Sequence, residues 1–107
     1  MLSESAVLSE EALVHVPSHL SFEGASTLPC AAVTAWVALT GHRRVTTGDT
    51  VLTQGFGGVS VFALQLARLL GAGVIATTST AEKADRLRAL GPPDVVNYTE
   101  RNFPFLD

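Results

Sequence analysis

The sequence predicts an α/β fold built on a parallel sheet, and three observations carry this prediction. Short apolar segments typical of buried strands lie at 50–54, 74–78 and 94–98, with segments of helical length between them. Glycine-rich or proline-rich turns lie at their boundaries. Apolar strands that alternate with helices are typical of a parallel sheet with helical crossovers.

The N-terminal part is expected to hold a short strand followed by two helices. "ALVHVP" at 12–17 alternates apolar and polar residues before a proline, which predicts a strand. Ser21 is a suitable N-cap for a helix that begins at Phe22. A second helix is expected to begin at Pro29 and to end at Gly41.

The helix expected from Gly58 to Leu70 has apolar residues on most of its faces, so it should be largely buried. Its main apolar face should combine residues spaced by four and three positions, namely Phe62, Leu66 and Leu69.

The last helix is expected to run to about Leu90. Ser79 and Glu82 have the S-x-x-E spacing of a capping box, which predicts where this helix begins. "GPP" at 91–93 ends it before the third strand.

"VLTQGFGGVS" at 51–60 joins the first of the three strands to the helix after it. Gly55 and Gly57 occupy the first two positions of the dinucleotide fingerprint G-x-G-x-x-G/A, Ser60 is a small residue at the third, and Gly58 is an additional glycine. Bare backbone here lets an oxygen-rich ligand approach the amide N–H groups, and a helix N-terminus favours negative charge. We predict a diphosphate-binding turn; the alternative is a tight turn without a ligand.

The end of the second strand favours NADP over NAD. NAD sites usually place an acidic residue there, about 20 residues beyond the motif, to bind the ribose 2′-hydroxyl. This sequence has "TTST" at 77–80 and no carboxylate before Glu82. Hydroxyl groups and Lys83 suit a 2′-phosphate. The alternatives are that Ser79 is only an N-cap and that Lys83 is only a solvated helix residue.

Composition and charge exclude several classes of protein. A chain of 107 residues with 47% hydrophobic and 16% charged residues is expected to be one folded domain. The net charge of −3 and the scattered basic residues give no nucleic-acid footprint. No secretory signal is present, and the uncharged stretch 50–67 contains glycines typical of a strand–turn–helix. We expect a cytoplasmic protein that binds neither nucleic acid nor membranes.

Four segments resemble the medium-chain dehydrogenase/reductase superfamily: "STLPCAAVTAWVAL", "GDTVLTQGFGGVSVFALQLA", "GVIATTSTAEKADRLRALG" and "VVNYTE". The match is to its zinc-type alcohol dehydrogenase-like branch, which includes quinone oxidoreductases and enoyl reductases. The resemblance implies a Rossmann domain and hydride transfer between NAD(P)H and a small-molecule carbonyl, alcohol, quinone or activated alkene. It also implies that the full-length form is a homo-oligomer.

The resemblance further implies a set of cofactor contacts. The turn residues would surround the diphosphate, a helix threonine would lie near the nicotinamide, and four residues near the ends of the second and third strands would bind a 2′-phosphate. The alternative for the threonine is a hydroxyl bonded to its own helix, and for the tyrosine a packing role. In that order, the residues are Gly55, Phe56, Gly57, Gly58 and Val59; Thr34; and Thr78, Ser79, Lys83 and Tyr98.

Cys30 matches the position of one catalytic zinc ligand in the zinc-dependent members. Catalytic zinc needs three protein ligands, and His15, His19 and His42 do not fall on the other ligand positions. We therefore expect a buried, inert cysteine, no metal, and no catalytic acid or base in this chain.

The expected domain organisation follows from the same resemblance. Residues 1–20 would be the remnant of a catalytic domain, and 21–107 would be the first half of a doubly wound Rossmann sheet, truncated after its third strand. One alternative function is a non-catalytic nucleotide-binding or interaction module left by truncation. Another is an S-adenosylmethionine-dependent transferase, against which the absent acid and the pair Lys83 and Tyr98 count.

Overall fold

The sheet consists of β1 (Thr50–Gln54), β2 (Gly73–Thr78) and β3 (Asp94–Asn97) in the computed structural model, which describes residues 2–92 and 94–100. β2 is the central strand and pairs in parallel with both of its neighbours, in the order β1-β2-β3. The predicted α/β fold and parallel sheet are confirmed, and the order is that of half of a doubly wound sheet.

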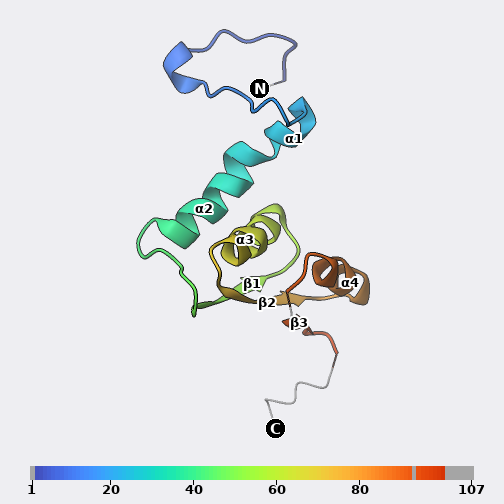
Figure 1. Cartoon of the computed structure of the whole chain (residues 1–107). Helices are drawn as coiled ribbons and strands as arrows, with labels where there is room; N and C mark the ends of the chain where they lie inside the picture. Colours follow the sequence, from blue (N-terminus) through green and yellow to red (C-terminus); the bar gives the residue numbers. More distant parts are fainter. Residues whose placement is uncertain (1, 93, 101–107) are drawn as a thin grey trace.

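The two crossover helices, α3 (Gly58–Leu69) and α4 (Ala81–Ala89), lie side by side on one face of the sheet (Figure 1). The strands follow each other in chain order, and both crossovers have the same hand, so both helices cover the same face. The turns that follow the three strands therefore lie at one edge, the carboxyl edge of the sheet.

The core fills the space between this face and the two helices. Val74 and Ala76 of β2 are buried against Leu64 and Ala67 of α3 and Leu87 of α4. The expectation that α3 is largely buried is wrong, since only Leu64 and Ala67 are fully buried. Only the side that faces β1 and β2 is buried, because a single sheet covers a single side of a helix.

The apolar face expected on α3 is also wrong. Leu69 is 82% exposed, whereas Phe62 and Leu66 are only partly buried. Apolar residues on every side of the helix left the sequence pattern without a preferred direction, and packing against the sheet selected the side that contains Leu64 and Ala67.

The helix ends are mostly where the sequence predicts them. Gly71 ends α3 with φ +83, and its N–H donates to the Arg68 carbonyl oxygen at 2.9 Å. The expected capping box of α4 is wrong by one residue. Thr80, not Ser79, accepts the Lys83 N–H at 3.3 Å, because it is Thr80 that leaves the strand in the extended conformation before the first turn.

The predicted strand at 12–17 is wrong. A 3-10 turn, η1 (Glu10–Ala12), overlaps its start, and the residues that follow form no strand. Val14 is 92% exposed. Alternation predicts a strand only where a neighbouring strand satisfies the backbone, and no described strand lies beside this segment.

Residues 22–40 form an almost continuous helical run: α1 (Phe22–Ser26), the π-helical turn η2 (Leu28–Ala32) and α2 (Val33–Thr40). Ser21 caps α1 as predicted by accepting the Gly24 N–H at 3.1 Å, and Gly41 is the C-cap of α2. α2 packs on α3 as a further layer, away from the sheet (Figure 1).

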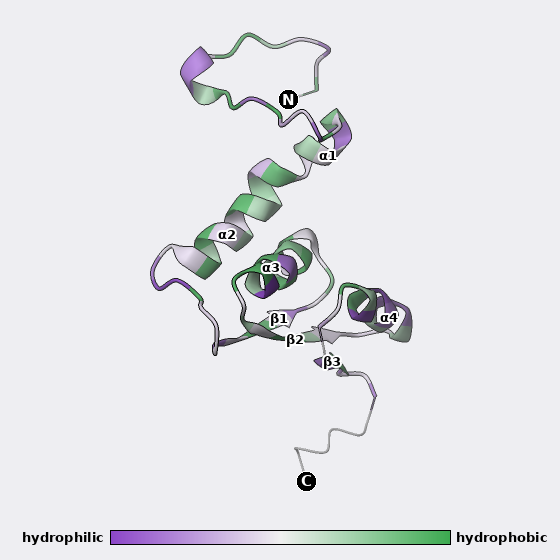
Figure 2. Cartoon of the chain, in the orientation of Figure 1, coloured by the Kyte–Doolittle hydropathy of each residue, from purple (hydrophilic) through white to green (hydrophobic). Residues whose placement is uncertain are grey.

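The residues of α2 are mostly apolar or near neutral in hydropathy, whereas many residues of α4 are hydrophilic (Figure 2). By length and composition alone, Phe22–Thr40, with a mean hydropathy of 1.2, would be long and apolar enough to cross a membrane. The core helices of water-soluble proteins meet the same criteria, so the expected absence of membrane binding stays a prediction.

The turn before β1 is held by Asp49. One carboxylate oxygen accepts the Thr46 N–H at 2.9 Å, and the other accepts from the Arg43 guanidinium at 2.6 Å. The Thr46 amide, together with the charge of Arg43, holds the pKa of the Asp49 carboxyl below its ordinary value of 3.8. A lowered folded-state pKa means that the fold favours the charged form of Asp49. The carboxylate therefore stabilises the fold fully above its ordinary pKa of 3.8, and this stabilisation is lost as the pH falls through the lower folded-state pKa.

We predict that Asp49→Asn reduces the pH dependence of stability in this acidic window. Urea midpoints measured by circular dichroism between pH 7 and about pH 3 should fall less in Asp49→Asn than in the wild type. Glu4→Gln, outside any element of the fold, is the control and should follow the wild-type curve. Parallel curves for Asp49→Asn and the wild type would contradict the prediction.

Candidate functional site

All three strands contribute to an open depression of about 470 Å³ at the carboxyl edge. Its lining residues are Gln54 at the end of β1 and Gly55 after it, Thr77 near the end of β2, and Tyr98 after β3. The Gly55 N–H donates to the Thr77 carbonyl oxygen and the Tyr98 N–H to the Thr78 carbonyl oxygen, each at 3.0 Å. These bonds extend the pairing beyond the strands, so the depression has a rigid backbone floor.

The three glycines of the turn have three different structural reasons. Gly55 has φ +84, which L side chains rarely adopt, so it makes the tight turn out of β1. Gly57 is extended, with φ −87, and a Cβ built on it would meet no atom within 4 Å. A Cβ on Gly58 would lie 3.3 Å from the Ala31 Cβ, so Gly58 allows η2 to approach α3 closely. Open space at a glycine that the backbone conformation does not require points to the approach of a ligand.

The N-terminus of α3 faces the same edge. Its first intrahelical hydrogen bond runs from the Val61 N–H to the Gly57 carbonyl oxygen at 3.0 Å, so the amides of Gly58, Val59 and Ser60 have no intrahelical acceptor. With the positive end of the dipole of a 12-residue helix, they favour an anion. Ser60 Oγ donates to the Gln54 carbonyl oxygen at 2.8 Å, which fits the helix–strand packing expected of the third fingerprint position.

The remaining residues expected around the diphosphate and nicotinamide differ in what they offer. Phe56 is partly buried and packs against the hydrophobic core. The Val59 side chain is 42% exposed. Thr34 is exposed on α2, and its hydroxyl donates to the Cys30 carbonyl oxygen at 2.7 Å, as in the alternative interpretation. Its contact with a nicotinamide stays a prediction.

The residues expected to bind a 2′-phosphate lie around the ends of β2 and β3. Tyr98 is 54% exposed and Ser79 is partly buried. Thr78 is only 1% exposed, and its hydroxyl is buried without a hydrogen-bond partner among the described residues. Thr78 therefore does not present its hydroxyl to solvent at this edge, because its side chain points into the same layer as Val74 and Ala76.

Lys83, the single lysine of the chain, lies in the first turn of α4 and is exposed. A cation at this end of a helix opposes the helix dipole. Within residues 2–92 and 94–100, no carboxylate lies within salt-bridge distance of it, whereas Arg86 and Arg88 pair with Glu82 and Asp85 at 2.8 Å. Because the helix dipole disfavours the Lys83 charge and no described carboxylate pairs with it, an anionic ligand near this end of α4 would be a favourable partner for it.

The sequence patterns missed several residues of this edge. Gln54 lines the depression, and Thr99 and Glu100 belong to a hydrogen-bond network after β3. Their position at the ends of predicted parallel strands was the only available signal, and it does not distinguish them from ordinary turn residues.

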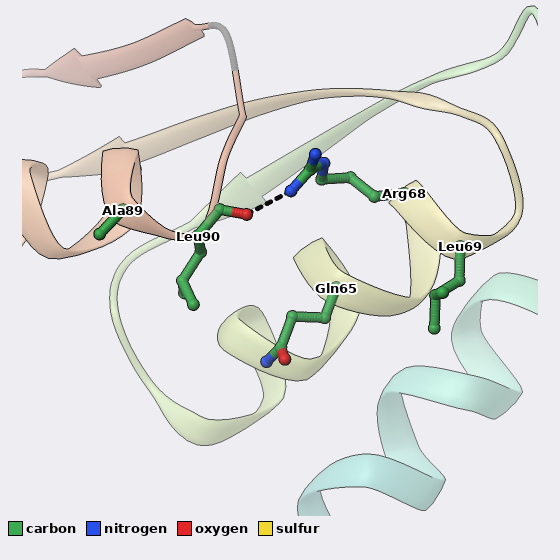
Figure 3. A pocket seen from close by; sticks show the side chains of 5 residues that line it. All are labelled: Gln65, Arg68, Leu69, Ala89 and Leu90. Carbon is green, nitrogen blue, oxygen red and sulfur yellow. Dashed lines mark hydrogen bonds between the residues drawn. The ribbon is translucent and has the colours of Figure 1, made fainter.

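Further hollows among the described residues lie away from the carboxyl edge. One of about 480 Å³ lies between the C-terminal parts of α3 and α4, where the Arg68 guanidinium donates to the Leu90 carbonyl oxygen (Figure 3). Arg68 there caps the C-terminus of α4, which is a structural role. Another, about 360 Å³, is apolar and lies between residues 14–17 and the helices that follow.

The described part of the chain holds no group of three or more His, Cys, Asp or Glu residues with a metal-site arrangement. Cys30 lies in η2 and is exposed, so the expected burial of its thiol is wrong. The reason is that η2 touches α3 through Ala31, which turns the neighbouring residue away from the contact. The absence of metal stays a prediction.

Comparison with known proteins agrees with this geometry, although no family model matches the sequence. A zinc-type alcohol dehydrogenase-like protein of Schizosaccharomyces pombe is 52% identical over 87% of this chain and 28% of its own length. The chain therefore spans less than a third of this relative.

Solved structures give the same result. The crystal structure of an NAD-dependent alcohol dehydrogenase superimposes with a TM-score of 0.82 at 43% identity, over 91% of this chain and 29% of that chain. A Thermus thermophilus quinone oxidoreductase, solved also in complex with NADPH, has a TM-score of 0.76 at 35% identity, over 84% of this chain and 30% of its own. One of these two similar proteins is thus described as NAD-dependent, and the other binds NADPH.

We predict that the purified chain carries no stoichiometric zinc. Among the described residues, Cys30 belongs to no group of three or more His, Cys, Asp or Glu residues that could hold a metal ion. Elemental analysis should find well under one zinc per chain, equal in the wild type and Cys30→Ser. One zinc per chain that is lost in Cys30→Ser would contradict this.

Proposed function

Because this chain belongs to the medium-chain dehydrogenase/reductase superfamily, we propose that it is the cofactor-binding part of an NADP-dependent oxidoreductase. The enzyme would transfer a hydride between NADPH and a carbonyl, alcohol, quinone or activated alkene. The observation that carries the proposal is the open space over Gly57 in front of the α3 N-terminus.

The residues present fit a dinucleotide. A diphosphate over Gly57 would accept hydrogen bonds from the free amides of α3 and would lie at the positive end of its dipole. A Cβ at Gly57 would fill the space that the diphosphate needs, although the protein itself leaves it empty. The depression beside Gly55 would continue the site across β2 to Tyr98.

Bound NADPH supplies the hydride, and the residues of this chain bind and orient it. The amides after Gly57 would hold the diphosphate, and the helix that carries Thr34 would lie toward the nicotinamide. No residue of this chain is assigned as catalytic acid or base, so we propose that the substrate pocket and any proton donor lie outside it.

Three features at the ends of β2 and β3 favour NADP over NAD. No carboxylate follows β2 directly, Lys83 is an unpaired cation among the described residues, and Tyr98 is exposed beside the depression. A 2′-phosphate between Lys83 and Tyr98 would receive charge-assisted hydrogen bonds.

The remaining parts of the proposal concern the substrate, the cellular location and the oligomeric state of the enzyme. We propose a small-molecule substrate, a cytoplasmic location and a homo-oligomeric full-length form, as the resemblance implies. Titration with NADPH, NADH and S-adenosylmethionine distinguishes the oxidoreductase from a non-catalytic module, which would bind none of them tightly, and from a methyl transferase.

We predict that Gly57→Val abolishes dinucleotide binding without unfolding the chain. The backbone at Gly57, with φ −87 and ψ 169, is one that valine adopts without strain, and a Cβ there meets no protein atom within 4 Å. Circular dichroism should therefore match the wild type, while NADPH titration followed by Trp36 fluorescence should show no saturation.

Gly48→Val is the matched control, because Gly48 lies in the turn before β1 and a Cβ there also meets open space. Its φ of +96 predicts a loss of stability of about 1–3 kcal/mol with unchanged NADPH affinity in the folded protein. A folded Gly57→Val protein with native NADPH affinity would contradict the dinucleotide proposal.

Lys83→Ala should weaken NADPH binding by about 1–3 kcal/mol and leave NADH binding unchanged, because only NADPH carries the 2′-phosphate. Calorimetric titration of both cofactors measures this. Arg88→Ala is the control, since Arg88 lies in the last turn of the same helix and pairs with Asp85. Tighter binding of NADH than NADPH by the wild type would contradict the assignment to NADP.

A further inference from the structure

The turn after β3 is tied to the turn after β2 by the side chain of Thr99. Its single hydroxyl hydrogen is shared between two acceptors, the Ser79 carbonyl oxygen at 3.0 Å and Asn97 Oδ1 at 2.8 Å. Ser79 and Thr99 are far apart in the sequence, so this is a tertiary contact between the ends of two parallel strands. It adds a side-chain bond to the main-chain bond from Tyr98 N–H to the Thr78 carbonyl oxygen.

Asn97 completes this bridge on the β3 side. Its Oδ1 accepts the Thr99 N–H at 3.2 Å, and its Nδ2 donates to Glu100 Oε1 at 2.8 Å. The amide group of Asn97 is thus oriented by three contacts, and the carboxylate of Glu100 is held at Asn97. Without the Thr99 hydroxyl, both Asn97 and the Glu100 carboxylate would be less constrained.

The bridge joins the elements that carry the residues proposed to bind the 2′-phosphate, the group by which NADPH differs from NADH. Ser79 precedes the helix of Lys83, and Tyr98 directly precedes Thr99, so the bridge sets the spacing between the elements that carry these residues. A carboxylate that moves freely here would repel a 2′-phosphate, whereas the 2′-hydroxyl of NADH carries no charge.

We propose that Thr99 is a positioning residue for cofactor selectivity, acting through its hydrogen-bond bridge between Asn97 and the Ser79 carbonyl. This inference rests on the proposed dinucleotide function and names the residue that tunes its specificity. Thr99 does not touch the phosphate; it holds Ser79 and Tyr98 at a fixed separation and keeps the Glu100 carboxylate bonded to Asn97.

The test compares Thr99→Val, which has the same shape without the hydroxyl, with Thr99→Ser, which retains the hydroxyl. Dissociation constants for NADPH and NADH are measured by calorimetry on the whole chain. Thr99→Val should weaken NADPH about fivefold, because the loss of one neutral hydrogen bond that positions the phosphate-binding residues can reduce affinity by about that much, and it should leave NADH within about twofold. Thr99→Ser should keep the wild-type ratio of the NADPH and NADH dissociation constants.

Thr27→Val is the matched control, because the Thr27 hydroxyl donates to the Gly24 carbonyl oxygen at 2.7 Å, at the end of α1. It should leave both constants unchanged. Thr99 is exposed, and circular dichroism checks that each variant is folded; Thr99→Ala serves as a second variant with the same expected result.

The outcomes separate the two proposals. A wild-type chain that prefers NADPH and a folded Thr99→Val variant with the same preference would overturn the role of Thr99 alone. A proportional loss of both cofactors in Thr99→Val would also overturn it, since a purely structural contact has that effect. A wild-type chain that binds neither cofactor would overturn the proposed function and this inference with it.

Discussion

Parallel pairing of β2 with both of its neighbours is the constraint on which the rest of the structure depends. In a parallel sheet each strand must be followed by a crossover that returns the chain to the starting edge. The helices α3 and α4 perform this return on the same face, so the ends of all three strands meet at one edge. Gly55, Thr77 and Tyr98 come together for this reason alone.

The same constraint explains why the opposite sheet face remains open. Side chains alternate along a strand, so Leu52 of β1 points away from the helices and is 56% exposed. The described residues place no helix on that side of the sheet (Figure 1). The buried core is correspondingly small, and most of α2 and α3 is accessible.

Two glycines of the turn are required for different structural reasons, backbone conformation and close packing, which the dinucleotide fingerprint does not distinguish. Gly55 is required by its own backbone conformation, and Gly58 by the contact of α3 with η2 at Ala31. Gly57 is required by neither, which makes it the informative member of the three. A motif match alone gives all three glycines equal weight, whereas their surroundings single out Gly57 as the one that neither backbone conformation nor packing explains.

The sequence by itself determined the order of the strands and helices, the parallel sheet and the position of the glycine turn. These depend on local periodicity, on Gly71 and Gly41 at helix ends, and on Ser21 as a cap, all of which act within a few residues. It failed at 12–17, on the buried side of α3 and at the cap of α4. At 12–17 and on α3, a partner distant in sequence, or its absence, decided the outcome, whereas at α4 the backbone conformation of Thr80 did.

The tertiary structure alone decided which side chains reach the carboxyl edge. It buried the Thr78 hydroxyl, exposed Cys30, and joined Thr99 to Ser79 across two strand ends. No local pattern encodes these facts, because they follow from the register between strands and from the direction in which each helix packs on the sheet. The sequence therefore predicted the types of residue at this edge, and packing set their arrangement.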